Sequence, residues 1–300
     1  MNQRIHLLIA LLLAALFAVA CGGESGETVL PFASPTTAPT PAEAPTRVPT
    51  STPSPTPTPV KEAPPPTVPP PLPTPTESES EQARVHFEKG GEHRNEGQLE
   101  LAVEEYDASI CLDPQYVDAY ISRGVTYIML GQILRGVIDL DKAVQIEPLN
   151  AIAYTHRGFA YLNLGLHQQA IADLDQAIRL DPENALAYLN RGLAYLDLKL
   201  YDRAMADFNE AISLEPVPWR GYNNRGLVYR DLGQYDRAIE DFNEAIRLGP
   251  QQALPYANRA TVYTILNMIG EAEADIEKAV ELGFDRALLE QEIMERAGRW

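Results

Sequence analysis

Apolar and small residues recur with a period of 34 along residues 83–286. Each period contains two stretches in which apolar residues are spaced as on one face of a helix. A short break separates the two stretches, and a proline closes the period. This proline occurs at Pro114, Pro148, Pro182, Pro216 and Pro250. The pattern predicts a stack of helix–turn–helix units that bury one continuous core.

The register of the repeat divides this part of the chain into six units and predicts an all-α protein. The approximate units are residues 83–116, 117–150, 151–184, 185–218, 219–252 and 253–286. In the fourth unit, residues 185–198 predict the first helix and residues 202–214 the second. Asp202 and, one period later, Asp236 are expected to cap second helices by accepting hydrogen bonds from free backbone N–H groups.

Small residues mark the helix ends and the helix crossings. A glycine follows the first helix in four units, because a left-handed residue after a helix suits glycine. These glycines are Gly97, Gly131, Gly165 and Gly233. Asn267 takes this place in the sixth unit, and Lys199 is the exception in the fourth.

A second set of small residues is expected where the two helices of a unit cross closely. It consists of Gly90, Gly124, Gly158, Gly192, Gly226 and Ala260. Large residues of the second helices are expected to fill the space beside them. These are Tyr106, Leu140, Leu174, Phe208, Phe242 and Ile276. Two tyrosines in most first helices, such as Tyr188 and Tyr195, are assigned to the same packing.

The pattern aromatic-x-x-x-Gly-x-x-Tyr, then Ala-x-x-x-Phe-x-x-Ala, then Pro resembles the tetratricopeptide repeat. The resemblance covers about residues 83–286. It implies a right-handed α-solenoid of six helix–turn–helix units, in which the first helices line a concave groove that binds a peptide. Like most stacked helical repeats, such an array is expected to bind proteins and not to catalyse a reaction.

One departure from the family is systematic. Where the family usually has a leucine before the glycine, this chain has Lys89, Arg123, Arg157, Arg191, Arg225 and Arg259. Each second helix carries an acid, at Glu105, Asp139, Asp173, Asp207, Asp241 and Asp275. We predict that each basic residue pairs with the acid of its own unit, because a partly buried guanidinium needs a partner. In the alternative, both side chains point into water and contribute little.

Residues 285–300 predict a helix that caps the last unit. Leu288, Leu289, Ile293 and Met294 have helical spacing among charged residues, so they are expected to cover the open face of the array. The first unit matches the repeat least well and is expected to be a more mobile end.

The N-terminus predicts export. Residues 1–20 contain a basic start and an apolar run from Leu7 to Ala20, which is shorter than the roughly 20 residues that span a bilayer. They are interpreted as a signal peptide, removed before Cys21. The junction resembles that of a bacterial lipoprotein, which implies a lipid on Cys21 and a place at the cell membrane or outer envelope. The residues Ala18 and Ala20 also fit ordinary cleavage, which would release a secreted soluble protein.

Residues 21–80 are interpreted as the lipid-anchor site followed by a disordered linker. Proline, threonine, alanine and serine dominate residues 31–76, and such a segment cannot form a core. Alternating prolines favour an extended polyproline II conformation. The linker would therefore act as a stalk that holds the repeats away from a membrane.

Charge and composition limit the partners. The chain carries 24 basic and 42 acidic residues, for a formal charge of −18. Nucleic acid and anionic membrane surfaces are therefore poor partners for the repeats, and we expect no nucleic acid and membrane contact only through the N-terminal lipid. Cys111 occupies a variable position and is expected to be an exposed thiol.

The residue types that carry out catalysis are not arranged for it. His86 and His93 have no ligands around them at zinc-site spacing, and no phosphate-binding loop or nucleophile motif occurs. Acid pairs such as Asp173 and Asp175 recur with the repeat and are interpreted as a solvated pattern. We expect no metal, no cofactor and no enzymatic activity.

The candidate peptide-binding groove is a second, variable stripe on the first helices. It consists of Ile121, Val125, Ile128, Met129, Thr155, Phe159, Leu162, Leu189, Leu193, Leu196, Asp197, Asn223 and Arg230. An apolar floor with amide and acidic edges suits an amphipathic or extended peptide. In the alternative, packing between units consumes part of this stripe. Some family members bind a peptide carboxylate with lysine and asparagine at the places of Leu189 and Leu193, so that clamp is not expected here.

Trp219 and Arg220 are a candidate contact hot spot beside the groove, because both types are frequent in interface centres. In the alternative, Trp219 packs onto the turn between Pro216 and Pro218. The sequence thus predicts a scaffold that recruits a protein or peptide at the cell envelope. A structural protein that self-associates through its array or its caps is the second hypothesis.

Overall fold

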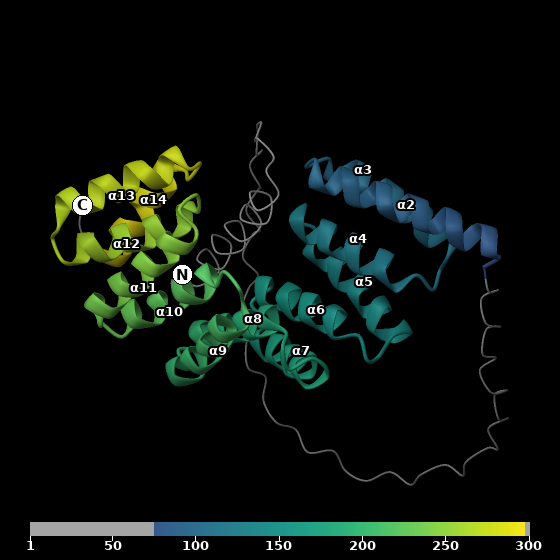
Figure 1. Ribbon diagram of the computed structural model, residues 1–300, viewed down its shortest axis with the longest axis horizontal. Coiled ribbons are helices and arrows are strands. Elements are labelled where there is room, and N and C mark those ends of the chain that lie inside the picture. Colours follow the sequence, from purple (N-terminus) through teal and green to yellow (C-terminus); the bar gives the residue numbers. More distant parts are fainter. Residues whose placement is uncertain (1–74, 298–300) are drawn as a thin grey trace, which may run out of the picture. The chain divides into compact units, whose positions relative to one another are not determined.

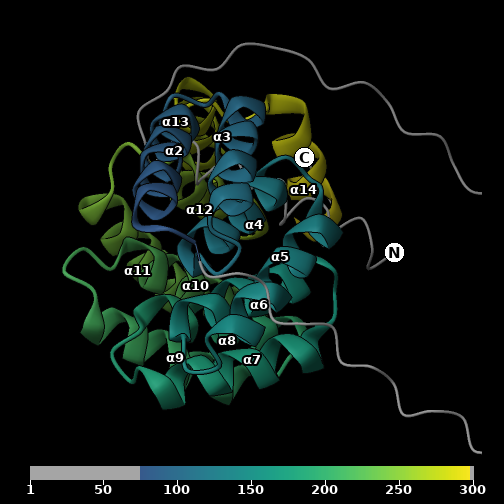
Figure 2. The same cartoon turned by 90° about the vertical axis from the view of Figure 1, so that its right-hand side faces the viewer.

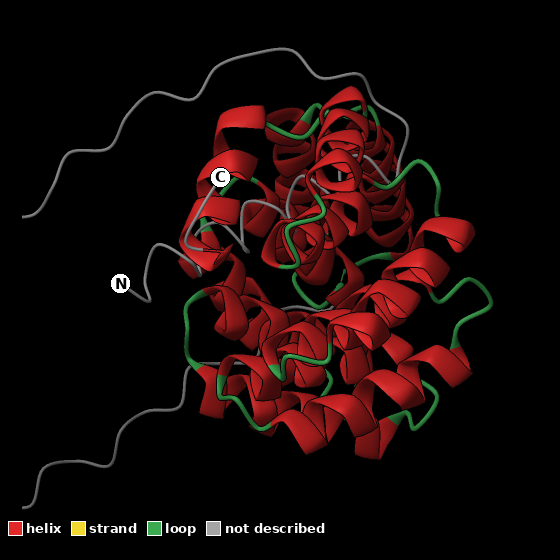
Figure 3. Ribbon diagram, turned by 90° about the vertical axis from the view of Figure 1, so that its left-hand side faces the viewer, coloured by secondary structure: helices red, strands yellow, loops and turns green. Residues whose placement is uncertain are grey.

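The computed structural model describes residues 75–297, and within this range all regular structure is helical (Figure 3). The described helices are α2 (Glu77–Asn95), α3 (Leu99–Leu112), α4 (Val117–Met129), α5 (Ile133–Ile146), α6 (Ala151–Asn163), α7 (His167–Leu180), α8 (Ala185–Asp197), α9 (Tyr201–Leu214), α10 (Trp219–Asp231), α11 (Tyr235–Leu248), α12 (Ala253–Ile265), α13 (Ile269–Glu281) and α14 (Arg286–Ala297). The fold is therefore the predicted all-α array of helix pairs.

The helices alternate between an inner and an outer layer. Each second helix packs against the first helix of its own unit and against that of the next unit (Figure 1, Figure 2). The first helices also contact one another, from α2 and α4 to α10 and α12, whereas neighbouring second helices of the described region do not pack together to a comparable extent. The first helices therefore form the inner layer of an α-solenoid.

Five first helices begin at the residues predicted from the period, but α2 does not. It begins at Glu77, so residues 77–80, predicted as part of the disordered linker, are helical. The reason is a capping box, in which the Thr76 hydroxyl accepts from the Glu79 backbone and the Glu79 carboxylate accepts from the Thr76 backbone.

The glycines after the first helices adopt the predicted left-handed conformation. Gly97, Gly131, Gly165 and Gly233 have φ between 71° and 76°. Lys199 and Asn267 adopt the same conformation with φ of 57° and 62°. The position in the repeat therefore determines the left-handed backbone conformation after the first helix, even where the residue is a lysine.

The predicted caps of the second helices are wrong. The N-cap residues of α9 and α11 are Leu200 and Gln234, and neither makes a side-chain cap hydrogen bond. Asp202 and Asp236 lie one residue inside their helices, in the first turn. Their negative charge there still interacts favourably with the positive end of the helix dipole.

Replacing Lys199 with glycine should raise the free energy of unfolding by about 0.5–1 kcal/mol, because a non-glycine residue is strained at positive φ. Urea unfolding of the full chain measures the change. Lys199→Ala is the matched control, since it removes the same side chain but keeps the strain. Equal stability of the glycine and alanine variants would contradict the strain at this residue.

Small residues meet large ones where the helices of a unit cross, as predicted. A Cβ atom placed on Gly192 would lie 2.5 Å from the ring of Phe208, and one on Gly158 would lie 2.7 Å from Leu174. The six large residues predicted for this position are all buried: Tyr106, Leu140, Leu174, Phe208, Phe242 and Ile276. The close approach of the two helices therefore depends on the missing side chain.

Helix α14 covers the last unit, as predicted, but with half of the predicted residues. Leu289 and Ile293 are fully buried in a cluster with residues of α12 and α13, whereas Leu288 and Met294 are exposed. The helix packs mainly against α12 and only slightly against α13. Asp285 caps it by accepting from the Leu288 backbone.

Several predictions concern residues outside the described range. The signal peptide, the lipid on Cys21 and most of the linker belong to residues 1–74. Among residues 75–297, no helix combines the length and the apolar character needed to cross a bilayer. Cys111 is an exposed free thiol, as predicted.

Candidate functional site

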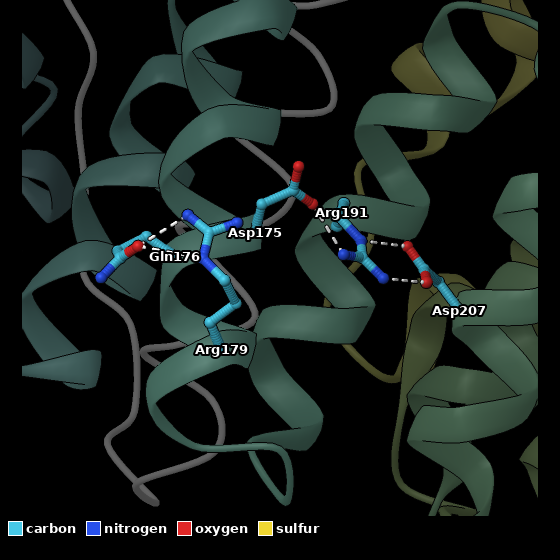
Figure 4. Close-up of polar contacts among 5 residues, drawn as sticks. All are labelled: Asp175, Gln176, Arg179, Arg191 and Asp207. Carbon is cyan, nitrogen blue, oxygen red and sulfur yellow. Dashed lines mark hydrogen bonds and ion pairs between the residues drawn. The ribbon is translucent and has the colours of Figure 1, made fainter.

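The predicted pairing between the two helices of a unit is present in units two to six. In the fourth unit, Arg191 donates from Nε and Nη2 to the two carboxylate oxygens of Asp207, over 2.8 and 2.7 Å (Figure 4). The same two-bond contact joins Arg123 to Asp139, Arg157 to Asp173, Arg225 to Asp241 and Arg259 to Asp275. A planar guanidinium matches a carboxylate in this way, which fixes the two helices in register.

The same arginines also bind the preceding unit, which the sequence analysis did not predict. Arg191 Nη1 donates to Asp175 on α7 over 2.7 Å. The corresponding acceptors in the other units are Asp107, Asp141, Asn209 and Asn243. Asp173 and Asp175 are therefore partners of two different arginines, and their interpretation as a solvated pattern is wrong. Each arginine connects three helices from two units.

Two tyrosines flank each of these arginines. The Arg191 guanidinium carbon lies 5.5 Å from the ring centre of Tyr188 and 5.9 Å from that of Tyr195. The aromatic faces attract the cation, so the two tyrosines also stabilise the arginine. Burial opposes the charge of Arg191, but the bonds to Asp207 and Asp175 outweigh it, so the pKa of Arg191 lies above its ordinary value.

The first unit lacks this contact. Lys89 is exposed, and its predicted partner Glu105 instead binds His86 Nδ1 over 2.6 Å. An ammonium cannot form the two parallel bonds of a guanidinium, so the lysine has less to gain from this position. The network therefore begins at Arg123.

A hollow opens on the inner layer across α6, α8, α10 and α12. The space between its lining side chains, including the open solvent at its mouth, is about 650 Å³. It is lined by His156, Phe159, Leu186, Leu189, Asn190, Leu193, Trp219, Arg220, Asn223, Asn224 and Leu254. Apolar side chains with a few convergent polar groups are the usual composition of a ligand site.

The structure divides the predicted groove residues into two sets. Those buried in the packing are Ile121, Ile128, Thr155, Leu162, Leu189, Asn223 and Arg230. Those still partly open are Val125, Met129, Phe159, Leu193, Leu196 and Asp197. An example of the first set is Thr155, whose hydroxyl accepts from Asn184, the N-cap residue of α8. Of the partly open set, Phe159 and Leu193 line the hollow.

Trp219 is buried, with 7% of its surface exposed, and is therefore not the surface residue that a hot spot requires. Its ring lies against Gly249, where a Cβ atom would be 3.2 Å away. Arg220 is half-buried and stacks on the ring, with its guanidinium carbon 4.6 Å from the ring centre. Both residues line the hollow.

A row of polar residues at one repeat position was missed by the sequence analysis. It consists of Ser122, His156, Asn190, Asn224 and Asn258. Asn258 donates to Asn223, which in turn donates to Asn224 at the edge of the hollow. Burial, together with the positive charge of Arg94, lowers the pKa of His156 to about 4. The recurrence of this position at the 34-residue period is the signal that could have identified the row.

Arg230, predicted in the groove, is buried at the end of α10. Its Nε and Nη2 both donate to Asp231, while Nη1 has no hydrogen-bond partner within the described part of the chain. Burial lowers the pKa of Arg230, and the positive charge of Arg296 on α14 adds to this effect. Arg230 does not line the hollow.

Among residues 75–297, no cluster of three or more histidine, cysteine, aspartate or glutamate side chains is placed to hold a metal ion. The candidate site is therefore a hollow of leucines, amides and one arginine on the inner layer of an α-solenoid built from 34-residue helix pairs.

Comparison with known families agrees with this class. Two family models described as tetratricopeptide repeat match residues 155–214 and 219–252, and one described as TPR repeat matches residues 90–131. The chain belongs to the tetratricopeptide repeat proteins, a family whose members in general bind proteins and are not catalytic. A comparison with curated proteins finds no match.

Solved structures share the fold. A chain in the crystal structure of the APC/C heterotetramer Cut9–Hcn1 has a TM-score of 0.66 at 20% identity. The match covers 74% of the present chain and 43% of the Cut9–Hcn1 chain. A tetratricopeptide repeat protein from Parabacteroides merdae has a TM-score of 0.62 at 21% identity, covering 72% of this chain and 84% of that one. PilF of Pseudomonas aeruginosa has a TM-score of 0.59 at 18% identity, covering 73% and 99%.

Proposed function

We propose that this protein is a non-catalytic scaffold that binds an apolar or amphipathic peptide segment of a partner protein in the hollow on its inner layer. The observation that supports it is the pair Phe159 and Leu193, the two partly open apolar residues of the predicted groove that line the hollow. Each apolar side chain that a peptide buries there contributes about 1.5–3 kcal/mol. Association entropy removes much of this gain, so affinity in the micromolar range is expected.

The proposal includes the place of action. The apolar run before Cys21 and the proline-rich segment after it support export and a lipid anchor, with the repeats held outside the cytoplasmic membrane. The formal charge of −18 makes an anionic lipid surface an unfavourable partner for the repeats. The partner is therefore a protein of the cell envelope.

Leu193→Asp should weaken binding at least tenfold, because it places a charge on the apolar floor of the hollow. Crosslinking of the full-length protein in intact cells captures the partner, and titration with the purified partner measures the affinity. Ile138→Asp is the matched control, since Ile138 is 66% exposed on the outer helix α5.

Three results would contradict peptide binding in the hollow. Equal binding by wild type and Leu193→Asp would place the contact elsewhere on the protein. Loss of helical circular dichroism in Leu193→Asp would show that Leu193 is a core residue. Crosslinks only between copies of the chain would favour the structural, self-associating protein.

A further inference from the structure

Arg220 is the only charged side chain among the residues that line the hollow, since the lowered pKa of His156 keeps its imidazole neutral. It lies in the first turn of α10. One period before and one period after Arg220, the same place holds Leu186 and Leu254. A cation has thus replaced an apolar residue in an otherwise uncharged site, within a protein whose net charge is negative.

The guanidinium of Arg220 does not bond neighbouring helices together, as that of Arg191 does. Arg191 makes three hydrogen bonds to two carboxylates, whereas Arg220 makes no hydrogen bond to any described residue and only stacks on Trp219. Glu215 is near enough to act on it electrostatically but forms no ion pair with it. A guanidinium has five N–H donors, so Arg220 can bind a further acceptor.

The groups around Arg220 determine what accompanies that acceptor. Phe159 and Leu193 offer apolar surface on the adjoining helices α6 and α8. Asn224 accepts from Asn223, which leaves its own amide N–H groups without a partner within the described chain. Free amide donors suit peptide carbonyl groups, and the positive end of the α10 dipole favours a negative charge close to Arg220.

We propose that the hollow binds a peptide segment that carries one carboxylate between apolar side chains, and that Arg220 binds this carboxylate. The inference rests on the proposed function and specifies the chemistry of the partner. A carboxylate matches the guanidinium with two parallel hydrogen bonds, and the partly buried site strengthens them relative to water. The carboxylate therefore provides selectivity. The net negative charge of the protein repels acidic peptides in general, so an acidic peptide also needs a flanking apolar side chain in order to bind.

The test uses two arrays of synthetic twelve-residue peptides composed of leucine, phenylalanine, alanine and serine. The arrays are identical except for one central residue, which is glutamate in one and glutamine in the other. Fluorescence anisotropy with the full-length protein measures the Kd of each matched pair. Wild type should bind the glutamate peptides about tenfold more tightly or better, which is the usual gain from a charge-assisted hydrogen-bond pair.

Arg220→Gln should remove this preference and leave the affinity for the glutamine peptides unchanged. Arg247→Gln is the matched control, because it deletes an equal charge from the exposed outer surface of α11. It should keep the tenfold preference. A double-mutant cycle between the protein residue and the peptide residue isolates the contact from any general change in charge.

The outcomes separate the two proposals. Peptides that bind through Leu193 but show no preference for glutamate would overturn the role of Arg220 and leave the scaffold intact. An equal preference in wild type and Arg220→Gln would also overturn it. No binding from either array would overturn both, and binding that follows self-association in sedimentation would make a second copy of this chain the occupant.

Discussion

Replacing Arg191 with leucine should lower the free energy of unfolding by about 3 kcal/mol or more. The change leaves Asp207, whose side chain is 7% exposed, as a buried carboxylate without its cation. It also removes the bond from α8 to Asp175 on α7, so two helix contacts weaken together. Leucine is the residue that the family usually has at this place, so the substitution is not excluded by its size. Urea and thermal unfolding of the full chain measure the loss.

Two controls test the cause of this loss. The double variant Arg191→Leu/Asp207→Leu should recover most of the stability, because removal of both buried partners leaves no uncompensated charge. Arg247→Leu should change stability by less than about 0.5 kcal/mol, since Arg247 and Glu244 form an exposed pair. An unchanged or higher melting temperature for Arg191→Leu would show that the network does not stabilise the array.

Gly192→Ala should lower the free energy of unfolding by about 2 kcal/mol. The new Cβ atom would lie 2.5 Å from the fully buried ring of Phe208, so the helices must move apart. In an unobstructed helix the same change would instead stabilise by about 1 kcal/mol, because alanine favours the helix. A loss of stability in urea unfolding would therefore show that α8 and α9 approach closely at Gly192, whereas a gain would show that they do not.

The sixth unit supplies a matched rescue for this variant. It has Ala260 and Ile276 at the places of Gly192 and Phe208, and both are buried. The double variant Gly192→Ala/Phe208→Ile should therefore be more stable than Gly192→Ala alone. A single variant that is more stable than wild type would show that the ring yields to the added methyl group.

The period of 34 predicts the contacts inside a unit well, because those contacts join residues at a fixed separation along the chain. The bond of Arg191 to Asp207 spans 16 residues, and so does its unexpected bond to Asp175. The second bond was predictable in principle, since Asp107 and Asp141 keep the same register. It was missed because the unit was considered alone, and adjacent units share their side chains.

Contacts between units are harder to predict because they depend on the rotation of one helix pair against the next. Leu189 and Leu193 lie one turn apart on the same helix, yet the first is buried and the second is partly open. The apolar stripe alone does not distinguish them. Trp219 is similar, because its burial depends on the backbone at Gly249 coming close.

The arginine network has a direction along the chain. Each arginine reaches forward to an acid in its own unit and back to the unit before it, as Arg157 does to Asp173 and Asp141. In a chain that emerges from its N-terminus, the earlier acceptor precedes the arginine by 16 residues, and the later one follows 16 residues afterwards. Each unit can thus attach to a finished neighbour as it emerges. In this network, loss of the last unit leaves every remaining arginine fully bonded, whereas loss of the first deprives Arg123 of Asp107.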